Sequence, residues 1–172
     1  MDDAIAIFLA FSSDRLDIKA LTTVAGNIPI KRTTRNALDL VGYIGKETKV
    51  SKGAERQLIR TLETAEWVHG KTGLGTLVLP ENNEPIYDKK AWDTIYEEAL
   101  ACEGKLQLIC LGPLTNIAIT LTVYPDIKDK IEKITLMGGS SYLGNTTPSA
   151  EFNIYADAEA ALNQEYLLEW YL

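Results

Sequence analysis

The chain has few cysteines and no excess of basic residues. Cys102 and Cys110 are its only cysteines, too few for a disulfide framework or a zinc site, and they fit the reducing cytoplasm. Lys and Arg number 17 against 24 Asp and Glu, which gives a formal net charge of -7 and no basic cluster. This charge argues against nucleic acids and anionic membrane surfaces as partners, whereas small neutral ligands remain open.

The sequence also lacks a long hydrophobic run. The apolar stretch 4–11 is too short to span a bilayer and has no basic segment before it, so it is neither a membrane helix nor a signal peptide. No internal repeat, linker or low-complexity segment divides the chain. With 46% hydrophobic and 24% charged residues, the composition predicts a single globular domain over residues 1–172.

Helical and strand patterns alternate along the chain. Apolar residues at helical spacing predict helices, and short apolar or β-branched runs that end at glycine predict strands. The expected helices span 4–10, 31–44, 89–104 and 114–123; the expected strands span 18–25, 49–51, 106–111 and 134–137, the last two buried. Residues 55–85 are expected to form a loop, which could act as a lid. The alternation predicts an α/β fold, an open and mostly parallel sheet with helices on both faces.

Two carboxylates, Asp2 and Asp3, stand directly before the first expected helix. Acids are favoured at a helix N-terminus, so a solvated cap plus one exposed acid would explain them. If both groups converged within about 4 Å, their repulsion would be on the order of 4 kcal/mol at an effective dielectric near 20, and a bound cation would remove it. Calcium and magnesium prefer such oxygen ligands. On the pair alone, both interpretations remain open.

Polar residues follow the expected strands where ligands bind in open α/β sheets, beyond the carboxyl ends. Amides that donate and accept, together with a carboxylate, suit the vicinal hydroxyls of a sugar. The residues concerned are Asn27, Asn145, Glu151 and Asn153. Each also has a plain structural explanation, because Asn27 and Asn145 could be turn residues in the left-handed conformation and Glu151 or Asn153 could cap a helix.

Four segments of the sequence resemble the inosine-uridine-preferring nucleoside hydrolase family, whose enzymes split the N-glycosidic bond of ribonucleosides with a calcium ion. They are Asp2-Asp3-Ala4-Ile5-Ala6; Thr22 to Asn27 with Thr34-Arg35-Asn36-Ala37; Gly112 to Ala118; and Met137-Gly138-Gly139 through Asn145, Thr147-Pro148 and Ala150-Glu151-Phe152-Asn153 to Ala156-Asp157. Their order and spacing agree with the family over residues 2 to about 161. The resemblance implies an incomplete copy of the family's Rossmann-like sheet.

The resemblance also implies a site. Its calcium ligands would be the carboxylates of Asp2 and Asp3 and the backbone carbonyl of Leu111, with Asp2 also reaching the ribose. Asn27, Asn145, Glu151 and Asn153 match the residues that hold the ribose. Met137 matches a residue that lines the sugar site, although core packing would explain it equally well. His69 lies in the long loop, where it is either a substrate contact or a structural loop residue.

By this resemblance the chain is a ribonucleoside hydrolase type of protein that cleaves purine or pyrimidine nucleosides to ribose and free base with a calcium-activated water. The family also has a general-base Asp ahead of the Asp pair and a later His-Asp pair, and this chain matches neither. We therefore expect little or no turnover of inosine or uridine. The alternative is a non-catalytic remnant that binds ribose or a partner chain. Relatives commonly form homo-oligomers, and after Ala161 the resemblance fades into an apolar tail, 162–172.

Overall fold

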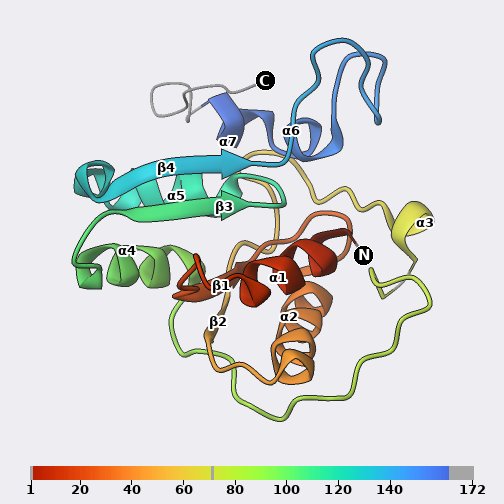
Figure 1. Cartoon of the computed structure of the whole chain (residues 1–172). Coiled ribbons are helices and arrows are strands. Elements are labelled where there is room, and N and C mark those ends of the chain that lie inside the picture. The colour runs from red at the N-terminus through yellow and green to blue at the C-terminus, as the bar shows by residue number, and fades with distance from the viewer. Residues whose placement is uncertain (1, 71, 163–172) are drawn as a thin grey trace.

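The structure is a computed structural model that describes residues 2–70 and 72–162. Helices and strands alternate along the chain, as the sequence pattern predicts (Figure 1). The helices are α1 (Asp2–Ser12), α2 (Ile30–Ile44), α3 (Glu66–His69), α4 (Ala91–Ala101), α5 (Thr115–Val123), α6 (Phe152–Ala156) and α7 (Ala158–Leu162), and the 3-10 helix η1 (Pro125–Lys130) follows α5. The strands are β1 (Ala20–Thr23), β2 (Lys49–Lys52), β3 (Leu106–Cys110) and β4 (Ile131–Leu136). The apolar tail lies outside the described residues from position 163 onward.

The strands pair in parallel, which confirms the predicted α/β class. β1 pairs with β2, from Ala20 opposite Lys49 to Thr23 opposite Lys52, and α2 makes the crossover between them. β3 pairs with β4 across the crossover helix α5. Within the described residues the two pairs form separate two-stranded sheets. Figure 1 shows the β3–β4 pair in the upper half of the molecule and the β1–β2 pair in the lower half, behind α1.

Helix α2 shows how local sequence sets an element's length. Its apolar residues Ala37, Leu38 and Val41 recur on one face and are buried. The helix ends at Gly45, whose φ of 69° lies in the left-handed region that glycine adopts without a steric penalty. The backbone N–H groups at this end donate to the carbonyls of Val41 and Gly42, so the last turn is capped. The predicted stop at this glycine is confirmed.

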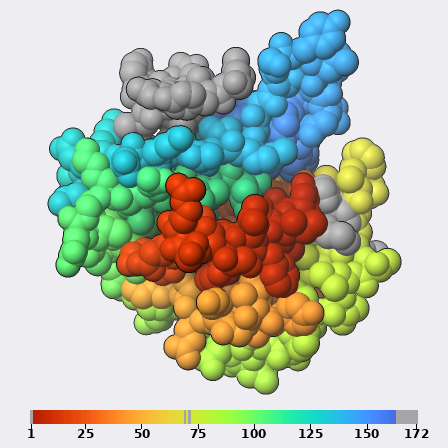
Figure 2. Space-filling view, viewed as in Figure 1, coloured from red at the N-terminus to blue at the C-terminus, as the bar shows by residue number. Residues whose placement is uncertain are grey.

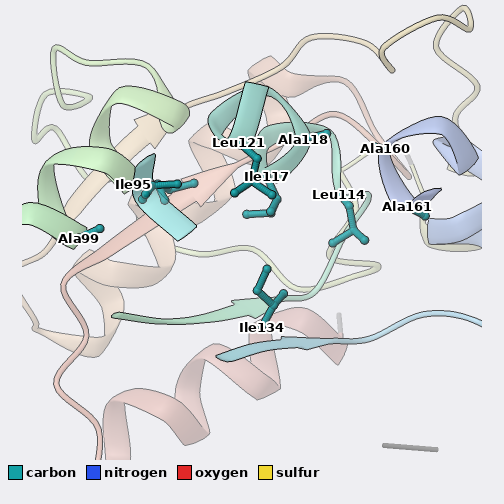
Figure 3. Packing of buried hydrophobic residues seen from close by; sticks show 10 residues of the cluster. Ile95, Ala99, Leu114, Ile117, Ala118, Leu121, Ile134, Ala160 and Ala161 are labelled. Carbon is teal, nitrogen blue, oxygen red and sulfur yellow. The ribbon is translucent and has the colours of Figure 1, made fainter. Parts of the chain in front are cut away.

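Among the described residues, the buried hydrophobic side chains form two clusters. The larger lies between α4, α5, α7 and β4 and is drawn in Figure 3. Its buried residues are Ile95, Ala99, Leu114, Ile117, Ala118, Leu121, Ile127, Ile134, Ala160 and Ala161. The smaller, formed by Ala37, Leu38, Val41 and Val50, lies between α2 and the β1–β2 pair, with Phe11 of α1 packed against it. A domain usually has one contiguous core with smaller satellite clusters, and the smaller cluster here lies in the half of the molecule that holds β1 and β2.

The burial predicted for β3 and β4 is correct for only one face of this strand pair. Strands β3 and β4 were expected to be buried, but Ile109 is 54% exposed and Gln107, Lys133 and Thr135 are also exposed. Among the described residues the larger core covers only one face of this pair, which is why the burial prediction is wrong for the other face. The loop expected over residues 55–85 is confirmed apart from the single turn of α3. No described helix combines the length and apolarity needed to cross a membrane.

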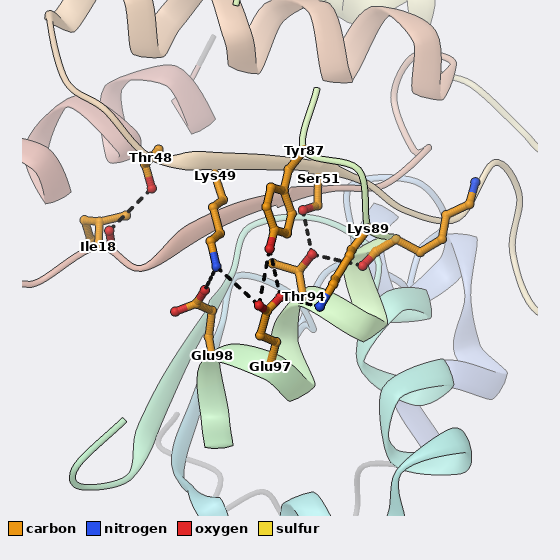
Figure 4. A network of polar contacts seen from close by, with 10 residues as sticks. Ile18, Thr48, Lys49, Ser51, Tyr87, Lys89, Thr94, Glu97 and Glu98 are labelled. Carbon is orange, nitrogen blue, oxygen red and sulfur yellow. Dashed lines mark hydrogen bonds and ion pairs between the residues drawn. The ribbon is translucent and has the colours of Figure 1, made fainter. Parts of the chain in front are cut away.

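A polar network ties β2 to α4 (Figure 4). Lys49 Nζ donates to Glu98 Oε1 at 2.6 Å, and the Glu97 carboxylate accepts a hydrogen bond from the Tyr87 hydroxyl at 3.0 Å. The hydrogen bond to Glu98 raises the pKa of Lys49 above the usual range of lysine. Glu98 is only 9% exposed, so its charge depends on this partner.

We predict that Lys49→Met lowers the free energy of unfolding by about 1 to 2 kcal/mol, because it leaves the Glu98 carboxylate without its cation. Since the pKa of Lys49 is raised on folding, this stabilisation is complete below about pH 10.4 and declines as the pH rises from there toward the folded-state value. Urea unfolding of both proteins across this pH range measures the effect.

Lys89→Met is the matched control, because Lys89 is half exposed and pairs with the partly exposed Glu97 at 3.1 Å. We expect it to change the free energy of unfolding much less than Lys49→Met does, because solvent screens an exposed ion pair. Equal effects of the two substitutions would contradict the role given to Lys49.

Candidate functional site

A cavity of about 730 Å³ lies between α1, β1 and β3 and reaches the carboxyl ends of these strands. Five of the predicted site residues line it: Asp2, Asp3, Asn27, Leu111 and Asn153. They come from four segments that are far apart in the sequence. In the space-filling view, α1 lies across the front of the molecule, between the β3–β4 half above and α2 below (Figure 2). These five predicted residues are therefore brought to one cavity, whereas Met137, Asn145 and Glu151 do not line it.

The Asp pair is carried by the first turn of α1, where both residues are exposed and line the cavity. The free N–H groups and the dipole of a helix N-terminus favour negative charge, so the fold places these acids where a helix accepts them. Ala4 is the only buried residue of this helix. Beyond Ala4, the helix is held by partly buried side chains such as Phe11, which packs against the smaller cluster.

The ends of β1 and β3 meet at the rim of the cavity. A Cβ atom added at Gly26 would lie 3.0 Å from Pro113 Cδ, and one added at Gly112 would lie 3.2 Å from Val24 Cγ1. Glycine at both positions therefore allows the two loops to pack closely. This contact brings Asn27, which follows β1, toward Leu111, which follows β3.

Asn153 links the ends of β3 and β4. Its Nδ2 donates to the Leu111 carbonyl at 3.2 Å and to the Met137 carbonyl at 3.0 Å, and the side chain is 7% exposed. Met137 itself is 47% exposed, so core packing does not explain it. The sulfur of Met137 lies 3.2 Å from the same nitrogen. Asn153 thus fixes the backbone position of Leu111, the carbonyl predicted to bind calcium.

Glu151 caps helix α6. Its Oε2 accepts backbone N–H bonds from Asn153 at 2.9 Å, Ile154 at 3.3 Å and Gly139 at 3.2 Å. The residue is 7% exposed. The expectation of a helix cap is therefore confirmed for Glu151, and its role in holding ribose stays a prediction. Glu151 does not line the cavity, and its three hydrogen bonds tie the Gly138-Gly139 turn to the helix that carries Asn153.

The other predicted residues lie farther from the cavity or have no described side chain. Asn145 belongs to the loop between β4 and α6, and its Oδ1 accepts from the Phe152 N–H at 2.8 Å. Among the described residues only glycines have positive φ, so the left-handed turn interpretation of Asn27 and Asn145 is wrong. The backbone of His69 ends α3. Its side chain lies outside what the structure describes.

Two buried polar residues hold the site together, and the sequence analysis did not assign them a role. Asn116 Oδ1 accepts from the Ala54 N–H and its Nδ2 donates to the Thr23 carbonyl, both at 2.9 Å. Asp157 accepts from the Thr115 hydroxyl at 2.5 Å and from the Leu58 N–H at 3.0 Å. Both residues lie inside the segments that carry the family resemblance, which is the one signal that could have pointed to them.

The donors at the cavity suit a hard cation. The carboxylates of Asp2 and Asp3 and the carbonyl of Leu111 are oxygen ligands, and the Leu111 carbonyl keeps a second lone pair beside its bond from Asn153. No described group of three or more His, Cys, Asp or Glu side chains could hold a metal. A cation here would therefore need the carbonyl, water and ligand hydroxyls as further donors.

Burial raises the pKa of the Cys110 thiol to about 12, so this cavity-lining cysteine stays protonated and is a poor nucleophile.

Comparison with known proteins identifies one family by sequence. Residues 1–163 match the model of the family described as inosine-uridine preferring nucleoside hydrolase. The non-specific ribonucleoside hydrolase RihC of Escherichia coli strain SMS-3-5 is 42% identical over 161 residues, which are 94% of this chain and 53% of that protein. The chain thus spans about half the length of the curated relatives it matches.

Solved structures agree with the sequence relatives. The purine-preferring ribonucleoside hydrolase from Gardnerella vaginalis superposes with a TM-score of 0.88 at 35% identity, over 93% of this chain and 52% of that one. A plant nucleoside hydrolase gives the same TM-score at 38% identity and the same coverage. The relative placement of the two strand pairs is therefore that of these longer proteins.

We predict that Glu151→Ala lowers the free energy of unfolding by about 1 to 2 kcal/mol, because three backbone N–H groups lose their shared acceptor. Hydrogen exchange should become faster at the amides of Gly139, Asn153 and Ile154. Glu84→Ala, at an exposed loop position, is the control and should leave both measurements unchanged. Unaltered exchange at Gly139 in Glu151→Ala would contradict the capping role.

Proposed function

The chain belongs to the inosine-uridine preferring nucleoside hydrolase family, and we propose that its cavity binds the ribose of a ribonucleoside for cleavage of the N-glycosidic bond. The products would be ribose and a free purine or pyrimidine base. The proposal is carried by one observation, the convergence of Asp2, Asp3, Asn27, Leu111 and Asn153 on a single cavity. These are donors of the kinds that a polyhydroxylated ligand and a hard cation require.

The chemistry of the bond explains why acids belong in this cavity. Cleavage of a C1′–N bond develops positive charge on the ribose, as in the oxocarbenium-like transition state of glycoside hydrolysis. The carboxylates of Asp2 and Asp3 would stabilise that charge more than the neutral ground state, which lowers the barrier. The amides of Asn27 and Asn153 would orient the ribose hydroxyls, with Asn145, Glu151 and Met137 supporting the rim.

We assign calcium to the carboxylates of Asp2 and Asp3 and the carbonyl of Leu111. When bound, the ion supplies positive charge that orients the ribose hydroxyls and makes a nearby water more acidic. Asn153 would keep the Leu111 carbonyl in place through its hydrogen bond at 3.2 Å. The two free cysteines agree with a cytoplasmic role in nucleoside catabolism and salvage.

Calcium binding is tested by titration calorimetry on the full 172-residue chain. We predict that Asp3→Asn weakens calcium binding at least tenfold, because it removes one anionic ligand. Asp14→Asn is the matched control, since Asp14 is exposed, follows the same helix and does not line the cavity. Equal calcium affinity in the native chain and Asp3→Asn would exclude the assignment of the metal to this pair.

Ribose binding is tested in the presence of calcium with Asn27→Ala. Asn27 uses its backbone carbonyl, not its side chain, to accept the Ala65 N–H at 2.9 Å, so the substitution leaves this structural contact intact. We predict a three- to tenfold loss of ribose affinity, about the value of one hydrogen bond. Asn83→Ala, in an exposed loop, should bind ribose like the native chain. Unchanged affinity in Asn27→Ala would remove Asn27 from the sugar site.

Release of ribose from inosine and uridine is measured on the same samples. We expect little turnover, because the chain spans about half the length of the relatives it matches. Calcium-dependent ribose binding without turnover would favour the second candidate function, a non-catalytic protein that binds ribose. Turnover as fast as that of a full-length relative would contradict this expectation.

A further inference from the structure

Met137 is the only methionine among the described residues, and its sulfur lies beside the amide that holds the Leu111 carbonyl. The residue directly follows β4 and is 47% exposed, so a small solute has access to its side chain. Its backbone is fixed on both sides, because its N–H donates to the Cys110 carbonyl at 2.8 Å and its carbonyl accepts from Asn153 at 3.0 Å. The thioether side chain is therefore the part of this residue that is free to change.

The side-chain amide of Asn153 has more acceptors around it than hydrogens to donate. Its Nδ2 carries two hydrogens. Three acceptors surround this nitrogen: the Met137 carbonyl at 3.0 Å, the Leu111 carbonyl at 3.2 Å and the Met137 sulfur at 3.2 Å. A thioether sulfur is a weak acceptor, so the two carbonyls hold the amide. This arrangement depends on the sulfur remaining a thioether.

The surroundings of Asn153 make its amide sensitive to a change at the sulfur. The backbone N–H donates to Glu151 Oε2 at 2.9 Å, and the residue is 7% exposed, so neither backbone movement nor solvent offers the amide another arrangement. A stronger acceptor at the sulfur would take one of the two hydrogens from a carbonyl. Of the two bonds to carbonyls, the one to Leu111 is the longer and is the one that would be lost.

We propose that Met137 is a site of reversible oxidation, where a peroxide converts the thioether to a sulfoxide and Asn153 transmits the change to the Leu111 carbonyl. A lone pair of the sulfur attacks one oxygen of hydrogen peroxide, and the O–O bond breaks. The proton of the transferred oxygen moves to the other oxygen, which leaves as water. The sulfur loses two electrons and the peroxide gains them. Oxidation of this kind turns an apolar side chain into a polar one and is reversed by methionine sulfoxide reductases.

The sulfoxide oxygen binds Asn153 Nδ2 in place of the Leu111 carbonyl. That carbonyl then loses the hydrogen bond that fixes its position beside the cavity. A cation held partly by the Leu111 carbonyl is bound less tightly as a result. This last consequence rests on the proposed function, whereas the sulfoxide and its hydrogen bond do not.

The test treats the full 172-residue chain with hydrogen peroxide and locates the added oxygen by mass spectrometry of its peptides. We expect a sulfoxide at Met137, shifted NMR signals of the Asn153 side-chain amide, and calcium affinity lowered about three- to tenfold, the value of one hydrogen bond. Methionine sulfoxide reductase with dithiothreitol should restore the signals and the affinity. Dithiothreitol alone, which reduces cysteine sulfenic acids and disulfides but not a sulfoxide, should restore neither.

Met137→Leu is the matched control, because leucine has a similar volume and no sulfur. The variant keeps Met1, Cys102 and Cys110, so any response to peroxide that remains comes from those residues. Compared with itself before and after treatment, it should show no shift of the Asn153 signals and no change in calcium affinity.

A second variant reproduces the oxidised state without an oxidant. Met137→Gln places an amide oxygen close to the position of the sulfoxide oxygen, and that oxygen is a stronger acceptor than a thioether. The Asn153 side-chain signals of this variant should differ from those of the native chain without peroxide, and peroxide should not move them further. This variant also keeps the test valid if Met137→Leu does not fold.

Four results would overturn the proposal. Met137 stays unmodified at a peroxide concentration that oxidises free N-acetylmethionine, its sulfoxide leaves the Asn153 signals in place, Met137→Leu responds to peroxide as the native chain does, or a chain that binds calcium keeps its affinity after oxidation. Absence of calcium binding in the untreated chain would instead refute the metal assignment of the proposed function. The Asn153 signals would then still decide whether Met137 acts on this amide.

Discussion

The structure depends on one buried amide, the side chain of Asn116. The β1–β2 and β3–β4 pairs share no ladder among the described residues, so something other than strand pairing has to connect them. Asn116 starts from α5, in the second half of the chain, and binds the Thr23 carbonyl at the end of β1 and the Ala54 N–H just after β2. A Cβ atom at Gly53 would lie only 2.3 Å from the Asn116 Oδ1, so this approach requires glycine there. Placement of Asn27 opposite Leu111 follows from this connection.

Much of the fold could be predicted because local rules and tertiary packing agree. The stop of α2 at Gly45 is determined by backbone sterics within one turn, and the apolar spacing of Ala37, Leu38 and Val41 needs no distant partner to be recognised. The exposure of Ile109 could not be predicted in this way, because it depends on which layers cover the strand. The backbone conformation of Asn27 was also missed, since residue type only biases a turn and the contact between Gly26 and Pro113 decides its path.

The residues that line the cavity could be predicted from the sequence, whereas the residues that support them could not. Asp2, Asp3, Asn27, Leu111 and Asn153 follow from the family resemblance, and the structure brings them to one cavity. The residues that support the site were not predicted, because Asn116 and Asp157 bind backbone groups that are 62 to 99 residues away in the sequence. Spacing in a sequence reports neighbours on one element, whereas such bonds are set only when separate elements pack together.

The anchoring of α1 has a thermodynamic consequence. Its one fully buried residue is Ala4, and Phe11 adds a partly buried contact with the smaller cluster, so α1 belongs to the part of the fold that opens more readily than the larger core. The Asp pair moves with it. A cation between this helix and the Leu111 carbonyl could bind only when α1 is docked. Its measured affinity would therefore include the free energy of docking the helix. The stability of α1 and the affinity for the ion are therefore coupled. A substitution that stabilises α1 raises the affinity for the cation without changing any of its ligands.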